Sequence, residues 1–294
     1  MIPLDSSDAV QDKFKEVLTM RNKIFVTRAD FMFDLQRFAE TVTYLDANGT
    51  EQTVSNVTTL TESTTTLNAG WYVVNSDLTI NHTLNTSGEI HLILADGAKL
   101  TINGDERGIY SSNTTSEKLN IYCQSNQSGE LVVTGATGYR AIWVSGGITI
   151  NGGNITTNSN YNGIYTDKEL KINGGKITDN SNNGISAYNF NLNWRNADDF
   201  IKTNKLESTN IAIGATIDDK IKISDGKRFY EDNGNIYSGN ITSEQFNYLN
   251  TAGAKTLKPV DGYIVTIFDG VNVESGNLPE SAPRTNISAR LALN

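Results

Sequence analysis

The chain has 294 residues, which is enough for one to two domains with a sizeable core. Its hydrophobic fraction of 37%, its scarcity of proline and its abundance of Gly, Asn, Thr and Ser suit many short strands joined by turns, and they argue against a helical bundle. A net charge of −9 without a basic stripe makes nucleic acid an unexpected partner, and one cysteine with two histidines excludes an internal disulfide and argues against a His/Cys zinc site.

Residues 1–40 hold the one helix-compatible stretch ahead of the β-rich region. Ser7 is a candidate N-cap for it. The apolar residues at helical spacing are Val10, Phe14, Val17 and Leu18. Charged residues interrupt every apolar run, so we expect neither a secretory leader nor a transmembrane helix here. Met32–Glu40 reads like a fresh N-terminus, which makes residues 1–31 a candidate mis-assigned extension.

Residues 41–70 are rich in threonine and alternate weakly, and we expect opening strands and an N-terminal cover there. Residues 71–240 contain an internal repeat of about 22 residues, which we call a rung. Gly147–Thr156 is followed by Leu170–Thr178, and both carry the Ile-Asn-Gly-Gly pattern. A further apolar burst recurs with them, as Ala141–Trp143, Gly163–Tyr165 and Gly184–Ser186. Each rung therefore contains three short apolar bursts.

Looser copies extend the repeat to about six rungs. The upstream copies are Ile90–Leu94, Leu100–Ile102, Gly108–Tyr110, Leu119–Cys123 and Leu131–Val133. The downstream copies are Phe190–Trp194, Asn210–Gly214 and Lys220–Ile223. Polar, Gly/Asn/Ser-rich loops at 111–118 and 124–130 account for the extra length of two rungs.

Each burst alternates apolar and polar residues, which places one face inward and one outward. A single rung cannot bury its own apolar face, so we expect the rungs to stack and their strands to pair in parallel. The inward residues should include Ile150, Ile164, Ile172 and Ile185. Gly and Asn suit the sharp corners between strands, where Asn151 and Asn173 should stack. These features predict an all-β fold, a right-handed parallel β-helix; a β-sandwich or a meander of hairpins remains the alternative.

The repeat stops near residue 241. Thr242–Leu249 reads as a short capped helix with Phe246 and Leu249 on one side, and we expect residues 241–258 to cap the solenoid. A strand at Tyr263–Phe268 should follow Pro259, and residues 259–294 are a linker or the start of a further β module.

Three stretches together carry a resemblance to a known group: Ala69–Val74, His91–Ile102 and the Ile-Thr-Ile-Asn-Gly-Gly repeats. They resemble the β-helix repeat regions of large bacterial cell-surface and adhesin-like proteins. The resemblance covers about residues 60–260. It implies a right-handed parallel β-helix and an extracellular or cell-surface setting, but it does not imply a defined activity, because many unrelated proteins use such repeats.

Carbohydrate-active enzymes also use this fold, and they depend on particular catalytic residues. Two carboxyl groups must face one site for glycoside cleavage, but neighbours on a strand point to opposite faces. We therefore expect the pairs Asp198/Asp199 and Asp218/Asp219 to be solvated corner residues, and Asp167 and Asp179 to form turns. A Gly-His-Gly arrangement is absent, and His82 and His91 precede the regular rungs. Cys123 should point inward as a structural thiol.

The position after the inward Ile of one burst is aromatic in three successive rungs, as Tyr110, Trp143 and Tyr165, with Ser186 next. These rings should form an outer ladder, which either binds a glycan or merely stabilises the sheet. We expect a non-enzymatic surface or extracellular protein that binds glycan or cell-surface polysaccharide, without metal or cofactor. The alternative is a carbohydrate-active β-helix enzyme or a phage tailspike-like fibre.

Overall fold

A computed structural model describes residues 41–111, 116–225, 227–231, 234–239, 241–259, 263–269 and 272–278. The helix expected within residues 1–40 lies outside these residues. The chain divides into two compact parts, residues 1–42 with 53–57 and residues 43–52 with 58–294. The site residues described below lie in the second part, and so do the sheets, except for the two-stranded sheet of residues 42–45 and 51–54, whose residues fall in both parts.

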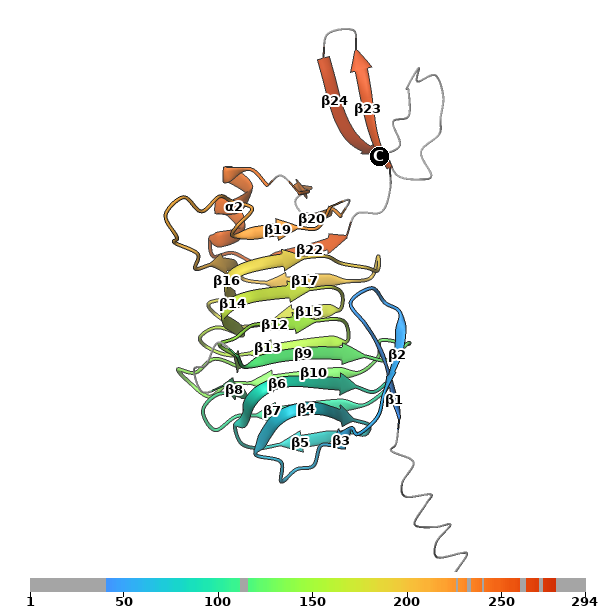
Figure 1. Cartoon of the computed structure of the whole chain (residues 1–294). Coiled ribbons are helices and arrows are strands. Elements are labelled where there is room, and N and C mark those ends of the chain that lie inside the picture. Colours follow the sequence, from blue (N-terminus) through green and yellow to red (C-terminus); the bar gives the residue numbers. More distant parts are fainter. Residues whose placement is uncertain are drawn as a thin grey trace, which may run out of the picture. The chain divides into compact units, whose positions relative to one another are not determined.

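The strands closest to the N-terminus are β1 to β6. β1 (Val42–Leu45) and β2 (Glu51–Val54) form a two-stranded sheet. β3 (Thr58–Thr59) pairs in parallel with β4 (Thr66–Val74), which pairs with β6 (Leu84–Leu94) from Thr66 to Val74. The parallel pairing of β4 with β6 therefore begins at Thr66, ahead of residue 71, where the sequence predicted that the repeat starts (Figure 1).

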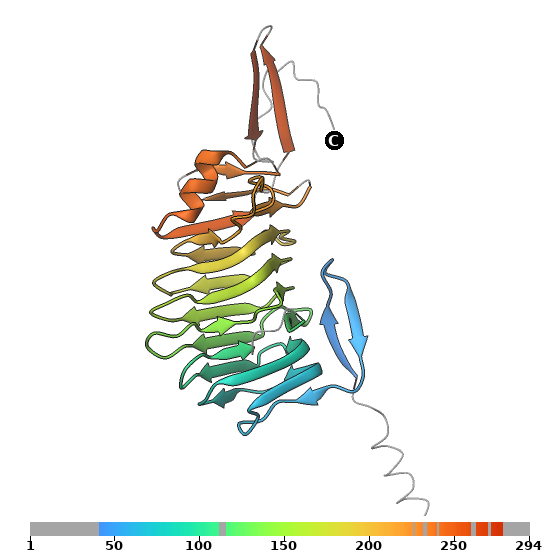
Figure 2. The ribbon, with the colours of Figure 1, turned by 60° about the vertical axis from the view of Figure 1, so that its left-hand side comes forward.

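One parallel sheet takes one short strand from each rung. Its parallel strands, in order, are β5 (Leu78–Ile80), β7 (Lys99–Asn103), β10 (Glu130–Thr134), β13 (Asn154–Asn158), β15 (Lys176–Asp179) and β17 (Phe200–Thr203). Ile155 lies opposite Ile177 in register, as predicted from the 22-residue spacing. Figure 2 shows these strands succeeding one another in the order of the chain.

The other large sheet combines the remaining two bursts of each rung. Beside β4 and β6 it contains β8 (Ile109–Ser111), β9 (Lys118–Cys123), β11 (Ile142–Trp143), β12 (Ile148–Ile150), β14 (Ile164–Ile172), β16 (Ile185–Leu192), β18 (Leu206–Ser208) and β19 (Ile221–Ile223). The first part of β14 pairs with β11 and its last part with β12, so the pairings close a ring through β6, β9, β12, β14, β11 and β8.

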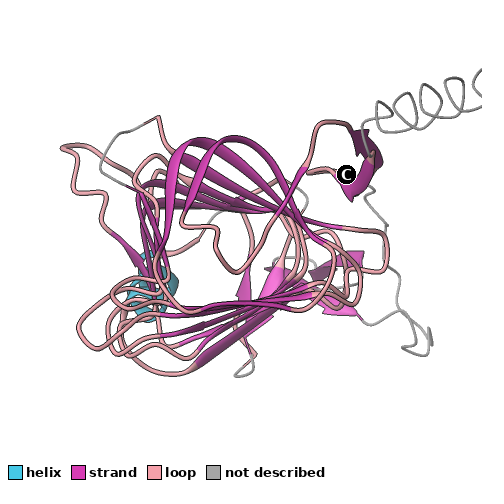
Figure 3. Cartoon of the chain, turned by 90° about the horizontal axis from the view of Figure 1, so that it is seen from below, coloured by secondary structure: helices cyan, strands magenta, loops and turns pink. Residues whose placement is uncertain are grey.

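Long strands such as β14 turn a corner within their length, where the register with β16 shifts between Thr166 and Glu169. The parallel strands thus fall into three columns, and the view along the stack shows the strands of successive rungs overlying one another (Figure 3). This all-β, mostly parallel arrangement is compatible with a β-helix-like solenoid.

The interior is a column of branched aliphatic side chains. Ile150, Ile164, Ile172 and Ile185 are fully buried, which confirms the inward face predicted from the alternation. At the corner, the side-chain amide of Asn173 donates to Oδ1 of Asn151 at 2.8 Å, as the predicted stacking requires. The side chains alternate because the pleat places every second residue on the core side.

Asn210–Gly214 is a loop, so its prediction as a repeat strand was wrong. The side chains of Ile211 and Ile213 are 91% and 107% exposed. Leu206, in β18, takes the expected place opposite Ile185, 21 residues on. The Ile-Ala-Ile pattern resembles a strand burst, but the inward residue of this rung is Leu206, five positions before Ile211.

In the sheet that contains β17, the parallel order ends at that strand. β22 (Lys255–Pro259) pairs antiparallel with β17 and with β20 (Phe229–Glu231), and β20 pairs antiparallel with β21 (Ile236–Tyr237). The predicted capped helix is α2 (Ser243–Asn250); Thr242 and Gln245 form a capping box, and Leu249 is buried. β23 (Tyr263–Asp269) and β24 (Asn272–Leu278) form a separate antiparallel pair, which confirms the strand predicted after Pro259.

Candidate functional site

The three aromatic residues singled out in the sequence lie in register on one column of strands. Trp143 is paired with Tyr110 on one side and with Tyr165 on the other. The ring centroids are 5.4 Å apart for Tyr110 and Trp143, and 5.8 Å apart for Trp143 and Tyr165. All three side chains are partly exposed, while the isoleucine before each is buried. We call these three residues the ladder; Ser186, next in register, is itself buried.

The ladder is not one flat platform. The ring planes of Tyr110 and Trp143 are inclined by 60°, and those of Trp143 and Tyr165 by 87°. Cross-strand aromatic pairs prefer such tilted and edge-on contacts to face-to-face stacking. A single planar ligand therefore cannot lie against all three ring faces.

Two arginines, which the sequence analysis missed, lie over the ladder rings. The guanidinium carbon of Arg107 lies 4.4 Å from the ring centroid of Tyr110 and 4.8 Å from that of Trp143. Arg140 lies 4.6 Å from Trp143 and 3.9 Å from Tyr165 in the same measure. At these distances, guanidinium and ring attract each other as cation–π pairs. The sequence does contain a signal for these contacts, because each arginine stands three residues before a ladder residue.

Asp167 ties the ladder together at the corner inside β14. Its carboxylate accepts a hydrogen bond from Nε1 of Trp143 at 3.3 Å and from the hydroxyl of Tyr165 at 2.9 Å. Burial, together with this hydrogen bond to Asp167, raises the pKa of Tyr165. The sequence predicted that Asp167 forms a turn; in the structure it lies within β14, at the register shift, and its carboxylate accepts hydrogen bonds from two ladder residues.

A second aromatic cluster, which the sequence analysis did not predict, contains Tyr44, Trp71, His91 and Tyr122. The His91 ring stacks on Trp71 with centroids 4.3 Å apart, and its Nδ1 lies 3.1 Å from the Tyr122 hydroxyl. Tyr44 packs at 4.8 Å from Trp71 and 4.9 Å from Tyr122. Burial lowers the pKa of His91, against the opposing effect of Glu89, and burial raises the pKa of Tyr122 to about 12. These rings cover one another, and Tyr44 packs against Trp71 in β4 and Tyr122 in β9.

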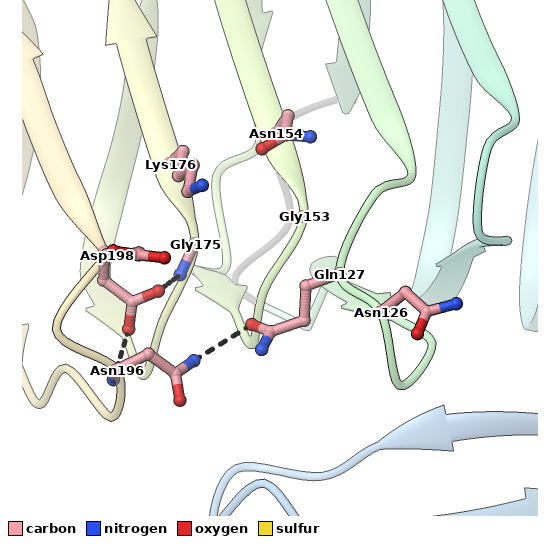
Figure 4. A pocket seen from close by; sticks show the side chains of 9 residues that line it. Asn126, Gln127, Gly153, Asn154, Gly175, Lys176, Asn196 and Asp198 are labelled. Atoms are coloured by element: carbon pink, nitrogen blue, oxygen red, sulfur yellow. Dashed lines mark hydrogen bonds between the residues drawn. The ribbon is translucent and has the colours of Figure 1, made fainter.

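A polar groove of about 280 Å³ lies at the Asn-Gly-Gly corners (Figure 4). It is lined by Asn126, Gln127, Gly153, Asn154, Gly175, Lys176, Asn196, Asp198 and Asp199. Figure 4 shows the side-chain amide of Asn196 reaching Oε1 of Gln127, at 3.1 Å. The groove contains no aromatic ring, so it offers hydrogen bonds without a stacking surface.

Asp199 is buried, so the prediction that it is a solvated corner residue was wrong. Its Oδ1 accepts from the backbone N–H of Gly175 at 2.9 Å. Its Oδ2 accepts from the backbone N–H groups of Asn196 and Arg195, at 2.9 and 3.2 Å. The carboxylate thus organises the corner between β16 and β17, while its neighbour Asp198 is exposed as predicted.

The other carboxylates considered in the sequence also have structural surroundings. Asp218 and Asp219 are exposed, as predicted, and Asp219 accepts from the backbone N–H and hydroxyl of Thr216. Asp179 is buried and accepts from the hydroxyls of Thr157 and Thr203 and, as a turn former does, from the N–H of Ser181.

Cys123 is fully buried, as predicted, and burial raises the pKa of its thiol to about 11. A thiol in this state is a poor nucleophile at neutral pH. Among the described residues, no three His, Cys, Asp or Glu side chains gather closely enough to hold a metal ion. No helix in the described part of the chain is long and apolar enough to cross a membrane.

Comparison of the chain with protein-family models, with curated proteins and with solved structures finds no match.

Proposed function

We propose that this chain is a non-enzymatic binding protein, built as a right-handed parallel β-helix and displayed at a bacterial surface or outside the cell. Its ladder is the binding face, and its ligand is a carbohydrate chain. The observation that carries the proposal is the register of Tyr110, Trp143 and Tyr165 on one outer column, with all three rings partly exposed.

The parallel pairing supports a right-handed helix, because connections between parallel strands of one sheet are right-handed in almost all proteins. The surface setting rests on the resemblance of the repeats to cell-surface β-helix regions. An adhesin-like role suits a rigid repetitive scaffold that presents one row of side chains to a polymer of similar repeat.

The ladder suits a sugar because it combines apolar ring area with fixed polar groups. Binding sites for small polar ligands typically join aromatic walls to a few placed hydrogen-bonding groups. Here Asp167 and the two arginines are the polar groups, and Trp143, in the middle of the ladder, contacts both neighbouring rings. The corner groove, which lacks a ring, supports carbohydrate binding less well.

The test is the substitution Trp143→Ala, with retention on polysaccharide affinity gels and thermal unfolding as readouts. We expect retention to weaken at least about tenfold, which corresponds to about 1.4 kcal/mol, with a folded protein of similar melting temperature. Trp71→Ala, in the aromatic cluster around His91, is the matched control and should retain the polysaccharide. Equal retention by Trp143→Ala and the parent chain would refute the ladder as the binding face.

A further inference from the structure

We infer that the ladder's ligand is acidic: Arg107 and Arg140 bind the carboxylate or sulfate groups of an anionic polysaccharide. This inference rests on the proposed function and names the substrate class of the same face.

The two arginines occupy equivalent positions in neighbouring rungs. Ile109 is paired with Ile142, and each arginine stands two residues before its isoleucine. Parallel strands are about 4.8 Å apart, so the repeat brings two cationic side chains to adjacent levels of one column. Both arginines precede their strands, and two like charges at adjacent levels repel each other, so an anion that binds between or beside them relieves the repulsion.

Ring contacts orient the guanidinium groups for binding an oxyanion. Arg140 lies 4.6, 4.8 and 3.9 Å from the ring centroids of Trp143, Tyr161 and Tyr165. A guanidinium placed over a ring keeps its N–H groups pointing outward in its own plane. Those N–H groups match the two oxygens of a carboxylate or a sulfate, and the rings hold them in place before the ligand arrives.

Arg140 has no carboxylate at ion-pair distance in the described part of the chain. Arg107 has one, Glu106, at 3.3 Å. The nearby carboxylate of Asp167 accepts from the rings of Trp143 and Tyr165 instead. In addition, Nε of Arg140 is buried without a hydrogen-bond partner among the described residues. A half-buried guanidinium that lacks a counter-ion gains most from an anionic ligand, because charge-assisted hydrogen bonds are about twice as strong as neutral ones.

The deciding experiment compares polymers that differ in charge alone. The full chain is tested on affinity gels and by titration calorimetry with polygalacturonate and hyaluronate, each beside its carboxyl-reduced form, and with a sulfated dextran beside plain dextran. We expect at least tenfold tighter binding to the charged member of a pair, and a loss of that preference in Arg140→Gln. The carboxylate and sulfate pairs show which oxyanion is bound.

Lys171→Gln is the control, because it removes a cation from the other arm of β14 and should leave the preference intact. Melting temperatures establish that the variants are folded, and Arg107→Gln takes the place of Arg140→Gln if the latter does not fold. Equal binding of charged and neutral polymers, still lost in Trp143→Ala, would overturn the acidic-ligand inference and leave the proposed function standing. Failure of the parent chain to bind any of the polymers would overturn both.

Discussion

Asparagine side chains join successive rungs at the corners between strands. The amide of Asn173 donates to Asn151, and the amide of Asn193 donates to Asn173 at 3.3 Å. Asn180 donates in the same way to Asn158, at 3.1 Å. An amide both donates and accepts, so a stack of equivalent asparagines satisfies its own buried polar atoms without a different partner at each level.

His91 makes the stability of the fold depend on pH. Burial lowers its pKa below the ordinary value of about 6.5, so between the two values the unfolded chain binds more protons than the folded one. Stability must therefore fall as the pH drops through about 6.5. We expect denaturation midpoints at pH 7.5 and pH 5.5 to differ less in His91→Gln than in the parent chain.

The pH window isolates histidine, because exposed carboxylates titrate lower and tyrosines higher. The titratable groups that contact His91 are Glu89, on its own strand, and Tyr122, and Tyr44 packs beyond them on Trp71 and Tyr122; burial raises the pKa of both tyrosines. His82 is present in both proteins and cancels in the comparison. An unchanged pH dependence in His91→Gln would show that the half-buried ring does not resist protonation.

The burial of a single residue was predictable where the repeat fixed the direction of its side chain. It was less predictable where contacts with a partner outside the repeat determined the burial. The inward isoleucines and the buried Cys123 followed from period-two alternation. Asp199 did not, because its partners are three backbone N–H groups at a corner whose shape no pattern shows. The arginine contacts to the ladder were missed because Arg107 and Arg140 precede the strands, and side-chain reach, not periodicity, brings them to the rings.

At the scale of elements, the corners are the most constrained part of each rung. Gly175 has φ +110°, and a Cβ there would lie 2.9 Å from the carbonyl oxygen of Gly153 in the neighbouring rung. Gly138 also has a positive φ, of +88°, but a Cβ there would meet nothing within 4 Å. The two glycines therefore separate backbone strain from close approach between rungs.

We expect Gly175→Ala to lower the free energy of unfolding more than Gly138→Ala. Each variant carries the cost of a left-handed backbone, about 1–2 kcal/mol, and Gly175→Ala adds a clash of rung against rung. Urea denaturation of both variants measures the difference. Equal destabilisation would mean that the corner widens freely and that Asn-Gly-Gly is needed for its backbone angles alone.

Elements were predictable where a local signal agreed with the repeat. The capped helix α2 was found because Thr242 and Gln245 carry the capping box in sequence. Asn210–Gly214 was mistaken for a strand because alternation alone cannot tell an inward face from an exposed loop. The turn of β22 back against β17 has no sequence signal, since its partner is more than 50 residues earlier.

At the scale of the whole molecule, each parallel strand contacts mainly the rung before and the rung after it. In the long parallel sheet, β5 pairs with β7 at one end, and β17 pairs with β22 toward the other. Stability in such a stack is approximately the sum of rung and nearest-neighbour terms. A destabilising substitution at one end of the stack should therefore promote local unfolding at that end first.

Two matched truncations of core side chains to alanine test this nearest-neighbour coupling. Leu257, in β22, and Ile80, in β5, are both fully buried, and truncation of such a side chain to alanine costs about 2–5 kcal/mol. We expect Leu257→Ala to speed amide hydrogen exchange in β15, β17 and β22 while β5 and β7 keep their protection, and Ile80→Ala to give the mirror pattern. The two variants control for each other, because they remove similar apolar volume from opposite ends of one sheet. Faster exchange spread evenly over all strands in either variant would contradict nearest-neighbour coupling and show that the stack unfolds as one cooperative block.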